Sequence, residues 1–513
     1  MPYPLLPMST PYPQLRALQR EAATLASVNH LLNWDQETYM PHAAGDFRSD
    51  QQSLVAGMVH ERKTSPRLGE LIAACEADTA LDARAKASVR EMRRDFDRET
   101  KLPRSLVEEL SKTQSQSQEV WKEARAKNDF ALFAPWLEKV MGLTRRKAEC
   151  YGVPTFAGGV KGELYDALLD EYEPGMSARE IESIFTPLRA RLAGLVAAIA
   201  QSRNKPDRKV LELKFSQEQH TRFCRSVLEA MQFDLNAGRL DVATHPFCSG
   251  FAPGDTRLTF RWKTDNLLEP LYCVMHEAGH GLYEQGLPKS EHFGEPLGEA
   301  ISLGIHESQS RMWENFVGRS RAFWTWALPH AKQAYAPSLD SLTTDTMFRV
   351  VNIVQPSFIR VEADEATYNL HVMLRFAIER ALISQQLAVK DLPEVWNSTF
   401  KEFVGIDVPD DRRGCLQDVH WSFGLVGYFP TYTLGNLYAA QMWETINGHL
   451  PDLDDQLARG QFGALKHWLN QNVHAHGREF SASELCRKIT GKPLSADPLL
   501  RHLEGKLKPI YGL

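Results

Sequence analysis

The sequence predicts a mainly α protein, a single large helical body with one small antiparallel β-sheet. Apolar residues recur at steps of three and four along most of the chain, which is the period of an amphipathic helix. Alternation of period two is confined to residues 209–263, where Gly and Pro break it into short pieces. No repeat of about 20–50 residues and no low-complexity tract is present, so we expect neither a solenoid nor a disordered arm.

Helices account for the first two hundred residues. The apolar series over residues 15–32 stops before Pro41 and predicts an N-terminal helix. Ser177 and Glu180 form a capping-box pattern ahead of a second apolar series over residues 181–199. The polar segment 202–208 is the nearest feature to a linker, and it is too short to define a domain boundary.

Two segments with alternating side chains, 209–215 and 257–262, predict strands of the small sheet. They come just before the helix that carries the most informative motif of the chain. An edge strand there can bind an extended peptide by strand addition. The alternative is a sheet that is purely structural.

Composition excludes several classes of protein. The 513 residues are 43% hydrophobic and 24% charged, with a net charge of -6, so no cationic field exists to attract nucleic acid or anionic lipid. The seven cysteines form no CxxC pair, which disfavours a disulfide framework and indicates a reducing, cytoplasmic setting. Residues 421–443 carry no charge, but their Pro, Gly and polar residues predict a buried wall rather than a membrane span. The N-terminus does not resemble a secretory signal.

The motif that carries chemistry is His276-Glu277-Ala-Gly-His280, inside an uninterrupted helical stretch. His276 and His280 are four residues apart and share one helix face, where two neutral imidazoles can bind one Zn²⁺. Glu277 is turned by about 100° from His276. This places its carboxylate beside the metal, where it can accept a proton from an activated water.

A catalytic zinc site needs a third protein ligand and an open position. The extended motif with a third histidine requires Gly at 283 and His at 286, where this chain has Tyr283 and Gly286, so that class is excluded. Residues 298–311 predict a second helix that offers Glu299, His306 and Glu307, and a glutamate, either Glu299 or Glu307, is the expected third ligand. These two lie about 80° apart around a helix, and spacing alone does not choose between them. The one not chosen could orient a ligand histidine.

The whole constellation resembles the carboxypeptidase Taq family, also called thermostable carboxypeptidase 1, over nearly the whole chain. The segment LNWDQET at 32–38 fits the family. Apart from the zinc motif, any one of these sequence matches is weak evidence for the family when taken alone. Six short matches occur in order in the second half and are together specific: HPF at 245–247, DTRLT at 255–259, HEAGH at 276–280, HESQ at 306–309, IRVEAD at 359–364 and GCLQDVHW at 414–421.

The resemblance implies a metal-dependent carboxypeptidase that releases C-terminal amino acids from peptides with broad specificity and usually fails at C-terminal proline. It assigns the third ligand to Glu307 and implies one Zn²⁺ per chain, replaceable by Co²⁺ or another divalent ion. It also implies a deep substrate groove and a homodimer. We therefore expect one metallocarboxypeptidase domain over 1–513, with 1–205 as helical wall and lid and 206–513 as the catalytic region.

A carboxypeptidase must hold the terminal carboxylate of its substrate, and the planar fork of a guanidinium is well suited to this. Arg360 is the first candidate, because it lies beside apolar residues just before a helix expected over 362–381, where an unpaired cation is costly. The alternative is an internal ion pair with an acidic residue of 362–365. Arg257, on the expected edge strand, is a second candidate unless Asp255 simply neutralises it.

The tetrahedral oxyanion of peptide hydrolysis needs a hydrogen-bond donor opposite the metal. His420 and Tyr428, in a charge-poor stretch, are the candidates, whereas Tyr432 is expected in an aromatic core wall. A rival function is an endo-acting zinc oligopeptidase of the helical gluzincin type, which does not recognise the terminal carboxylate. A structural metal is disfavoured, because closed zinc sites have four protein ligands and only three are found.

Overall fold

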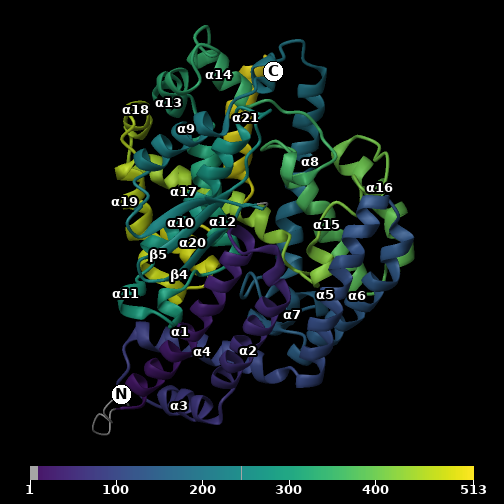
Figure 1. The fold of residues 1–513 in the computed structure, drawn as a ribbon, viewed down its shortest axis with the longest axis vertical. Coiled ribbons are helices and arrows are strands. Elements are labelled where there is room, and N and C mark those ends of the chain that lie inside the picture. Colours follow the sequence, from purple (N-terminus) through teal and green to yellow (C-terminus); the bar gives the residue numbers. More distant parts are fainter. Residues whose placement is uncertain (1–9, 244) are drawn as a thin grey trace.

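The computed structural model describes residues 10–243 and 245–513 and is mainly helical, as predicted. The N-terminal helices, purple and blue in Figure 1, form its lower part. Ser177 accepts a hydrogen bond from the Glu180 N–H at 3.1 Å and caps the predicted second helix. The helices of the first 205 residues are α1 Pro11–Thr38, α2 Gly45–Lys63, α3 Pro66–Glu76, α4 Ala83–Lys101, α5 Arg104–Lys127, α6 Phe130–Tyr151, α7 Leu164–Leu169 and α8 Ala178–Gln201, the last of which lies in the upper half of Figure 1.

The second half builds the centre of the molecule around α10 and α12, which pack against each other. In Figure 1 the chain then continues through the green and yellow helices that surround this pair. These helices are α9 Gln217–Ala230, α10 Glu269–Gly286, α11 Lys289–His292, α12 Leu303–Arg311, α13 Arg321–Ala334, α14 Thr344–Val351, α15 Tyr368–Ile383, α16 Leu392–Val404, α17 Pro430–His449, α18 Leu453–Ala458, α19 Gly463–Asn472, α20 Ala482–Thr490 and α21 Asp497–Tyr511.

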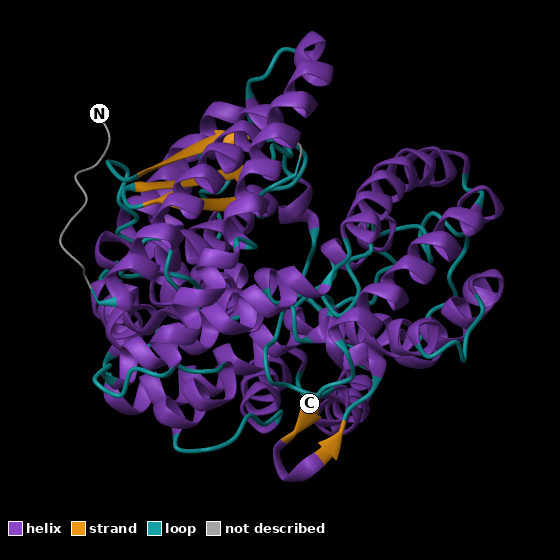
Figure 2. Ribbon diagram, turned by 90° about the horizontal axis from the view of Figure 1, so that it is seen from below, coloured by secondary structure: helices purple, strands orange, loops and turns teal. Residues whose placement is uncertain are grey.

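The larger sheet has three strands in the order β3-β5-β4, with β3 Gly238–Val242, β4 Cys248–Ala252 and β5 Asp255–Phe260. Figure 2 shows it on one flank of a body that is otherwise helical apart from the hairpin β1 Thr155–Phe156 and β2 Val160–Lys161. The sheet is mixed, because β3 runs parallel to β5 and only β4 is antiparallel to it. The expectation of a purely antiparallel sheet was therefore wrong, although its place beside α10 is as predicted.

The predicted strand over 209–215 was also wrong. Residues Lys209–Glu212 form a 3₁₀ turn, and the partly buried Val210, Leu211 and Leu213 pack on the main core. Only single backbone bonds leave this segment, such as that from Phe215 N–H to the carbonyl of Thr264. The β3 segment occupies the position beside β5, so alternating side chains alone did not produce a strand.

One continuous core holds residues from both sides of position 205, for example Ile181 of α8 and Leu271 of α10. A separate small core joins α1, α3 and α4 through Leu15, Leu71 and Val89. The N-terminal helices therefore contribute both to the main body and to a layer packed on it.

Two segments of the chain share a property with membrane-spanning helices, one by its length and apolar composition and the other by its lack of charge. Among the described residues, α8 alone is long and apolar enough by length and composition, but core helices pass the same test. Its buried side chains join the main core, where α8 packs against α15 and α21. The uncharged stretch 421–443 lies largely in α17, most of whose residues are buried, and so forms the predicted wall.

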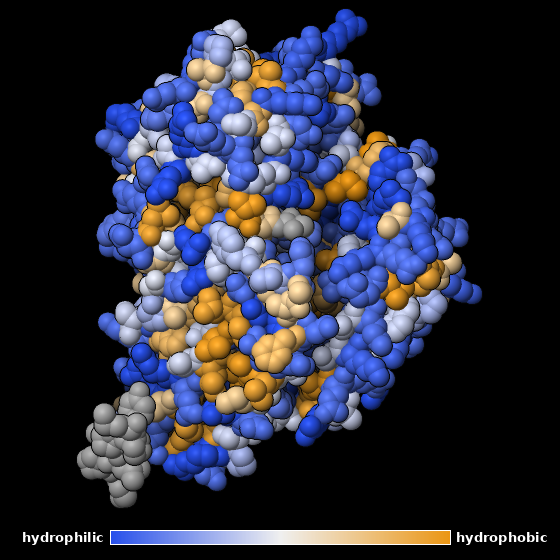
Figure 3. Space-filling model, viewed as in Figure 1, coloured by the Kyte–Doolittle hydropathy of each residue, from blue (hydrophilic) through white to orange (hydrophobic). Residues whose placement is uncertain are grey.

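The hairpin of α1 and α2 leaves several large apolar side chains in solvent. Phe47 and Leu54 of α2 are each 68% exposed, and Val28 and Leu31 of α1 are more than 40% exposed. Figure 3 shows hydrophobic atoms gathered on the face over these two helices. Nothing in α2 is buried, so this helix is held mainly by its contact with α1.

Candidate active site

The two histidines of the motif face the same side of α10 and converge on one point. Nε2 of His276 and Nε2 of His280 lie 3.2 Å apart. Both side chains keep some access to solvent, with exposed fractions of 20% and 15%. A shared face and partial exposure are what two imidazole ligands of an accessible ion require.

The structure brings Glu307, and not Glu299, to these histidines. The helix predicted over 298–311 begins only at Leu303, because Ser302 caps it by accepting a hydrogen bond from the Ile305 N–H at 3.0 Å. Glu299 thus lies outside α12, with its side chain 52% exposed and paired with Arg478 at 3.1 Å. The predicted angle of about 80° between Glu299 and Glu307 assumed that both lie on one helix. It does not apply, because only Glu307 lies on α12.

The three donor atoms fit a tetrahedral metal ion. Glu307 Oε2 lies 3.6 Å from His276 Nε2 and 3.5 Å from His280 Nε2. Ligands at about 2.0–2.1 Å from a tetrahedral ion are separated by roughly 3.3 Å. Among the described residues this is the one His/Cys/Asp/Glu cluster with such spacing.

Glycines allow the helices that carry these three side chains to approach closely. A Cβ on Gly279 of α10 would lie 2.6 Å from the Gln309 carbonyl oxygen of α12. A Cβ on Gly435 of α17 would lie 2.6 Å from Cβ of Glu307. Because α12 is packed between α10 and α17 at these two glycines, the Glu307 carboxylate is placed beside the two histidines.

Glu277 is buried, with 7% of its surface exposed, and it follows the first histidine directly in α10. Burial raises its pKa to about 7; the neighbouring His276 opposes this shift, and the negative charge of Glu307 adds to it. A carboxylate with a pKa in this range can both take up and release a proton at neutral pH.

A second carboxylate, Glu314, holds His276 from behind. It accepts a hydrogen bond at 2.9 Å from Nδ1 of His276, the ring nitrogen opposite the one in the cluster. It lies on a π-helical segment, Met312–Val317, that directly follows α12. Arg311 contacts both Glu307, at 2.6 Å, and Glu314, at 3.2 Å. Sequence analysis did not identify Glu314, because the local widening of the helix sets its direction and has no sequence signal. It also missed Arg311, although the i, i+4 spacing of Arg311 from Glu307 within one helix was a signal that could have found it.

Arg360 belongs to a buried charged group. Its Nε and Nη2 donate to Asp418 Oδ1 at 3.1 and 2.9 Å, and its Nη1 donates to the Tyr368 hydroxyl at 3.0 Å. Arg375 also donates to Asp418, at 2.7 Å. Burial raises the pKa of Asp418, but the two guanidiniums outweigh it and hold that pKa well below its usual range. The alternative considered for Arg360, an internal ion pair, is present, but its partner is Asp418 and not a residue of 362–365. The helix expected from 362 begins at Tyr368, after a 3₁₀ turn.

Aromatic rings surround this group. The Arg360 guanidinium lies 4.9 Å from the ring centre of Tyr432, whose hydroxyl is 3.4 Å from His420 Nε2. The Tyr428 ring lies 5.5 Å from that of His420. Burial lowers the pKa of His420 to about 3, so the ring is neutral at neutral pH. Tyr368, which sequence analysis did not identify, stacks under Arg311 at 4.3 Å and so links the arginine group to the cluster.

Arg257 has local partners. It lies on the central strand β5, not on an edge strand as expected, and it donates to both oxygens of Asp255 at 2.8 and 2.9 Å. The Trp34 ring of α1 covers its guanidinium at 4.3 Å. The edges of the sheet are β3 and β4, and it is β4 that lies against both α10 and α1.

A cleft of about 800 Å³ opens one helical turn beyond His280, at Glu284. One wall includes Gly250 of β4 and Lys289 of α11, and the opposite wall is made by α1, α4 and α5. Residues from the first two hundred positions therefore line this cleft, which approaches the cluster at Glu284 but is not lined by His276, His280 or Glu307.

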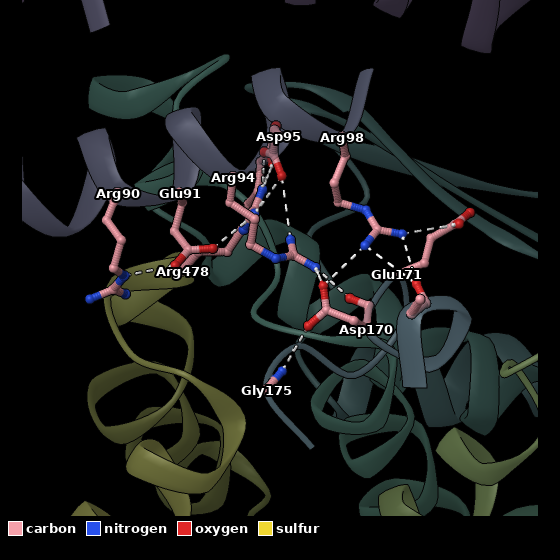
Figure 4. A network of polar contacts seen from close by, with 11 residues as sticks. Arg90, Glu91, Arg94, Asp95, Arg98, Asp170, Glu171, Gly175 and Arg478 are labelled. Atoms are coloured by element: carbon pink, nitrogen blue, oxygen red, sulfur yellow. Dashed lines mark hydrogen bonds and ion pairs between the residues drawn. The ribbon is translucent and has the colours of Figure 1, made fainter. Parts of the chain in front are cut away.

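Ion pairs bind this opposite wall to the rest of the protein (Figure 4). Arg478, in the 3₁₀ segment His474–Glu479, contacts Asp95 at 2.7 Å and Glu91 at 3.0 Å. Arg94 of the same α4 contacts Asp170, after α7, at 2.9 Å. Helix α4 is thereby held to two segments distant in sequence.

The protein is a helical body in which two packed helices bring together two histidines and a glutamate. A buried glutamate directly follows the first histidine. These features define a metallopeptidase of the His-Glu-x-x-His type. The family model of the carboxypeptidase Taq (M32) metallopeptidases matches residues 14–507. The chain belongs to this family and is a metallocarboxypeptidase, as its sequence predicted.

Similar proteins cover almost the whole chain. Thermostable carboxypeptidase 1 of Thermus thermophilus is 43% identical over 98% of this chain and 99% of its own length. Carboxypeptidase 1 of Bacillus subtilis is 34% identical, over 94% of this chain and 95% of its own. The crystal structure of the M32 carboxypeptidase from Deinococcus radiodurans R1 superposes with a TM-score of 0.94 at 38% identity, over 98% and 100% of the two chains.

Proposed function

We propose that His276, His280 and Glu307 hold one Zn²⁺ per chain, which Co²⁺ or another divalent ion can replace. The observation that carries this proposal is the spacing of their donor atoms, at 3.2, 3.6 and 3.5 Å. Two imidazoles and one carboxylate are also a donor set of catalytic zinc sites. When bound, the ion polarises the scissile carbonyl and lowers the pKa of water.

Glu277 acts as the general base. It takes the proton of the attacking water and returns it to the leaving nitrogen of the peptide. Its burial and its position directly after His276 support this role. Glu314 and Arg311 orient His276 and Glu307 through the contacts given above.

Arg360 binds the terminal carboxylate of the peptide. A guanidinium has five N–H donors, and three of its bonds within the described chain go to Asp418 and Tyr368. This leaves one donor on each terminal nitrogen, the fork that matches a carboxylate. Arg360 and Arg375 also share a single carboxylate, so the buried group has an excess positive charge that favours an anion.

His420 and Tyr428 are the proposed donors to the oxyanion. Their rings lie 5.5 Å apart, and His420 contacts the hydroxyl of Tyr432, whose ring lies 4.9 Å from the Arg360 guanidinium. Arg257 has a smaller part, because Asp255 already occupies both sides of its fork. With Trp34 over it, Arg257 is proposed to contact the bound peptide from the central strand of the sheet.

The substrates are peptides with a free C-terminus, cleaved with broad side-chain preference. The alternative is an endo-acting oligopeptidase that ignores the terminal carboxylate. Mass-spectrometric ladders from a peptide and from its C-terminally amidated twin, each with and without chelator, separate the two. Loss of single C-terminal residues from the acid alone supports the carboxypeptidase, whereas equal cleavage of the amide contradicts it.

We further propose that residues 1–513 act as one domain, with 1–205 as wall and lid and 206–513 as the catalytic region. The shared core and the cleft between these parts support this division. A cytoplasmic homodimer that binds neither nucleic acid nor membrane is the expected form. Seven free cysteines and the net charge of -6 support the compartment and the lack of nucleic acid binding.

A further inference from the structure

A histidine that binds a metal through Nε2 carries its proton on Nδ1, which needs an acceptor. For His276 this acceptor is Glu314. For His280 both acceptors within reach belong to His306: its carbonyl oxygen at 3.1 Å and its ring Nδ1 at 2.6 Å. A ring nitrogen accepts only in one tautomer, so the state of His306 decides whether the shorter contact is favourable.

Glu284 determines that tautomer. Its Oε1 lies 2.8 Å from Nε2 of His306, and an ionised carboxylate can only accept, so the proton of His306 is on Nε2 and Nδ1 has a free lone pair. Glu284 also forms an ion pair with Lys289. Burial raises the pKa of Glu284, but the hydrogen bond from His306 and the charge of Lys289 outweigh it and lower the pKa to about 2.

We propose that Glu284 is a positioning residue for the metal-binding imidazole of His280 and acts through His306. This inference rests on the ligand set proposed above. In the chain from His280 Nδ1–H to His306 Nδ1, and from His306 Nε2–H to Glu284, every donor meets an acceptor. The reverse tautomer of His306 would direct one N–H at another across 2.6 Å.

The same chain reaches the wall of the cleft. Lys289 Nζ donates to the Gly250 carbonyl of edge strand β4 at 3.2 Å. A Cβ on Gly250 would lie 2.1 Å from Glu284 Oε2, so the strand lies directly on this ion pair. Glu284 and Lys289 both line the cleft. The proposed orientation of His280 is thus connected, through Glu284, to the wall of this cleft.

The test is a Zn²⁺ titration of metal-free Glu284→Gln against a competing chelator. An amide presents either N–H or C=O to His306 and no longer imposes one tautomer, so we expect Zn²⁺ to bind about 10- to 100-fold more weakly. Because Glu284→Gln also loses its ion pair with Lys289, the metal-free variant should melt at a lower temperature, and the titration is carried out well below that temperature. Glu299→Gln is the matched control: it removes a carboxylate of the same cleft that pairs with Arg478, and it should leave the affinity unchanged. Wild-type affinity in Glu284→Gln would show that the His306 carbonyl suffices and would overturn the proposal.

His306→Leu provides a second variant if Glu284→Gln does not fold. It removes the ring acceptor and keeps the backbone carbonyl, so the same weakening is expected, and the double variant should be no weaker than either single one. Unchanged affinity in His306→Leu overturns the proposal equally. His280→Ala in the same titration separates a failure of the positioning role from a failure of the proposed ligand set. If it loses Zn²⁺ while the other variants keep it, only the positioning role fails; if it binds Zn²⁺ normally, the ligand set fails.

Discussion

Replacing Arg360 tests how the protein recognises the end of a peptide. In Arg360→Met, Asp418 keeps its bond of 2.7 Å to Arg375, so the buried group becomes a neutral pair and the fold should survive. The variant loses the excess positive charge and the two N–H donors that have no acceptor in the described chain. Arg360→Lys keeps the charge but loses the fork.

The size of the effect follows from these two donors. A hydrogen bond to a charged group contributes about 1.5–3 kcal/mol. We take the lower end of that range, because Asp418 already attracts part of the positive charge of Arg360. Two such bonds then contribute about 3 kcal/mol. This corresponds to roughly a 150-fold lower kcat/KM for Arg360→Met. Arg360→Lys, which retains one strong donor, should lose about tenfold.

The assay measures kcat/KM for a peptide and for its C-terminal amide with each variant. The wild-type protein should prefer the acid by about the same 150-fold, and Arg360→Met should cleave both slowly and with little preference. Arg413→Met is a matched control, because Arg413 lies five residues before Asp418, is exposed and pairs with Asp410. This variant should change neither rate. If Arg360→Met slows the acid and the amide by equal factors, Arg360 does not bind the terminal carboxylate.

Three further changes test the site. Glu277→Gln should keep its metal, measured by elemental analysis, while kcat falls by about 10²–10⁴-fold; an unchanged kcat refutes the general base. Gly279→Ala should push α12 away from α10, which should lower the free energy of unfolding in urea by about 1–3 kcal/mol and weaken Zn²⁺ binding. The control Gly57→Ala, with open space around its Cβ position, should not destabilise the protein. Chelation should abolish activity and lower the melting temperature in calorimetry, since an ion at 100 times its Kd stabilises by about 2.7 kcal/mol. A melting temperature that ignores the chelator contradicts tight binding to the folded state.

The helical part of the fold was predictable because its signals are local. The apolar periods of α1 and α8, the Ser177 cap and the His-Glu-x-x-His spacing each involve residues within a few turns of one helix. The strand over 209–215 failed for the opposite reason. A strand needs a partner, and the position beside β5 went to β3, so the alternating side chains of 209–215 packed on the core from a 3₁₀ turn.

The charged groups divide in the same way. The sequence by itself determined that two imidazoles share a helix face with a glutamate beside them, since the turn of the helix sets that geometry. Only the tertiary structure decided that Arg360 pairs with Asp418, that Glu314 holds His276, and that Glu284 reaches His280 through His306. These contacts join residues far apart in the chain or depend on where a helix widens or ends. The contact between Glu284 and His306 depends on how closely α10 and α12 pack at Gly279, which no local pattern encodes.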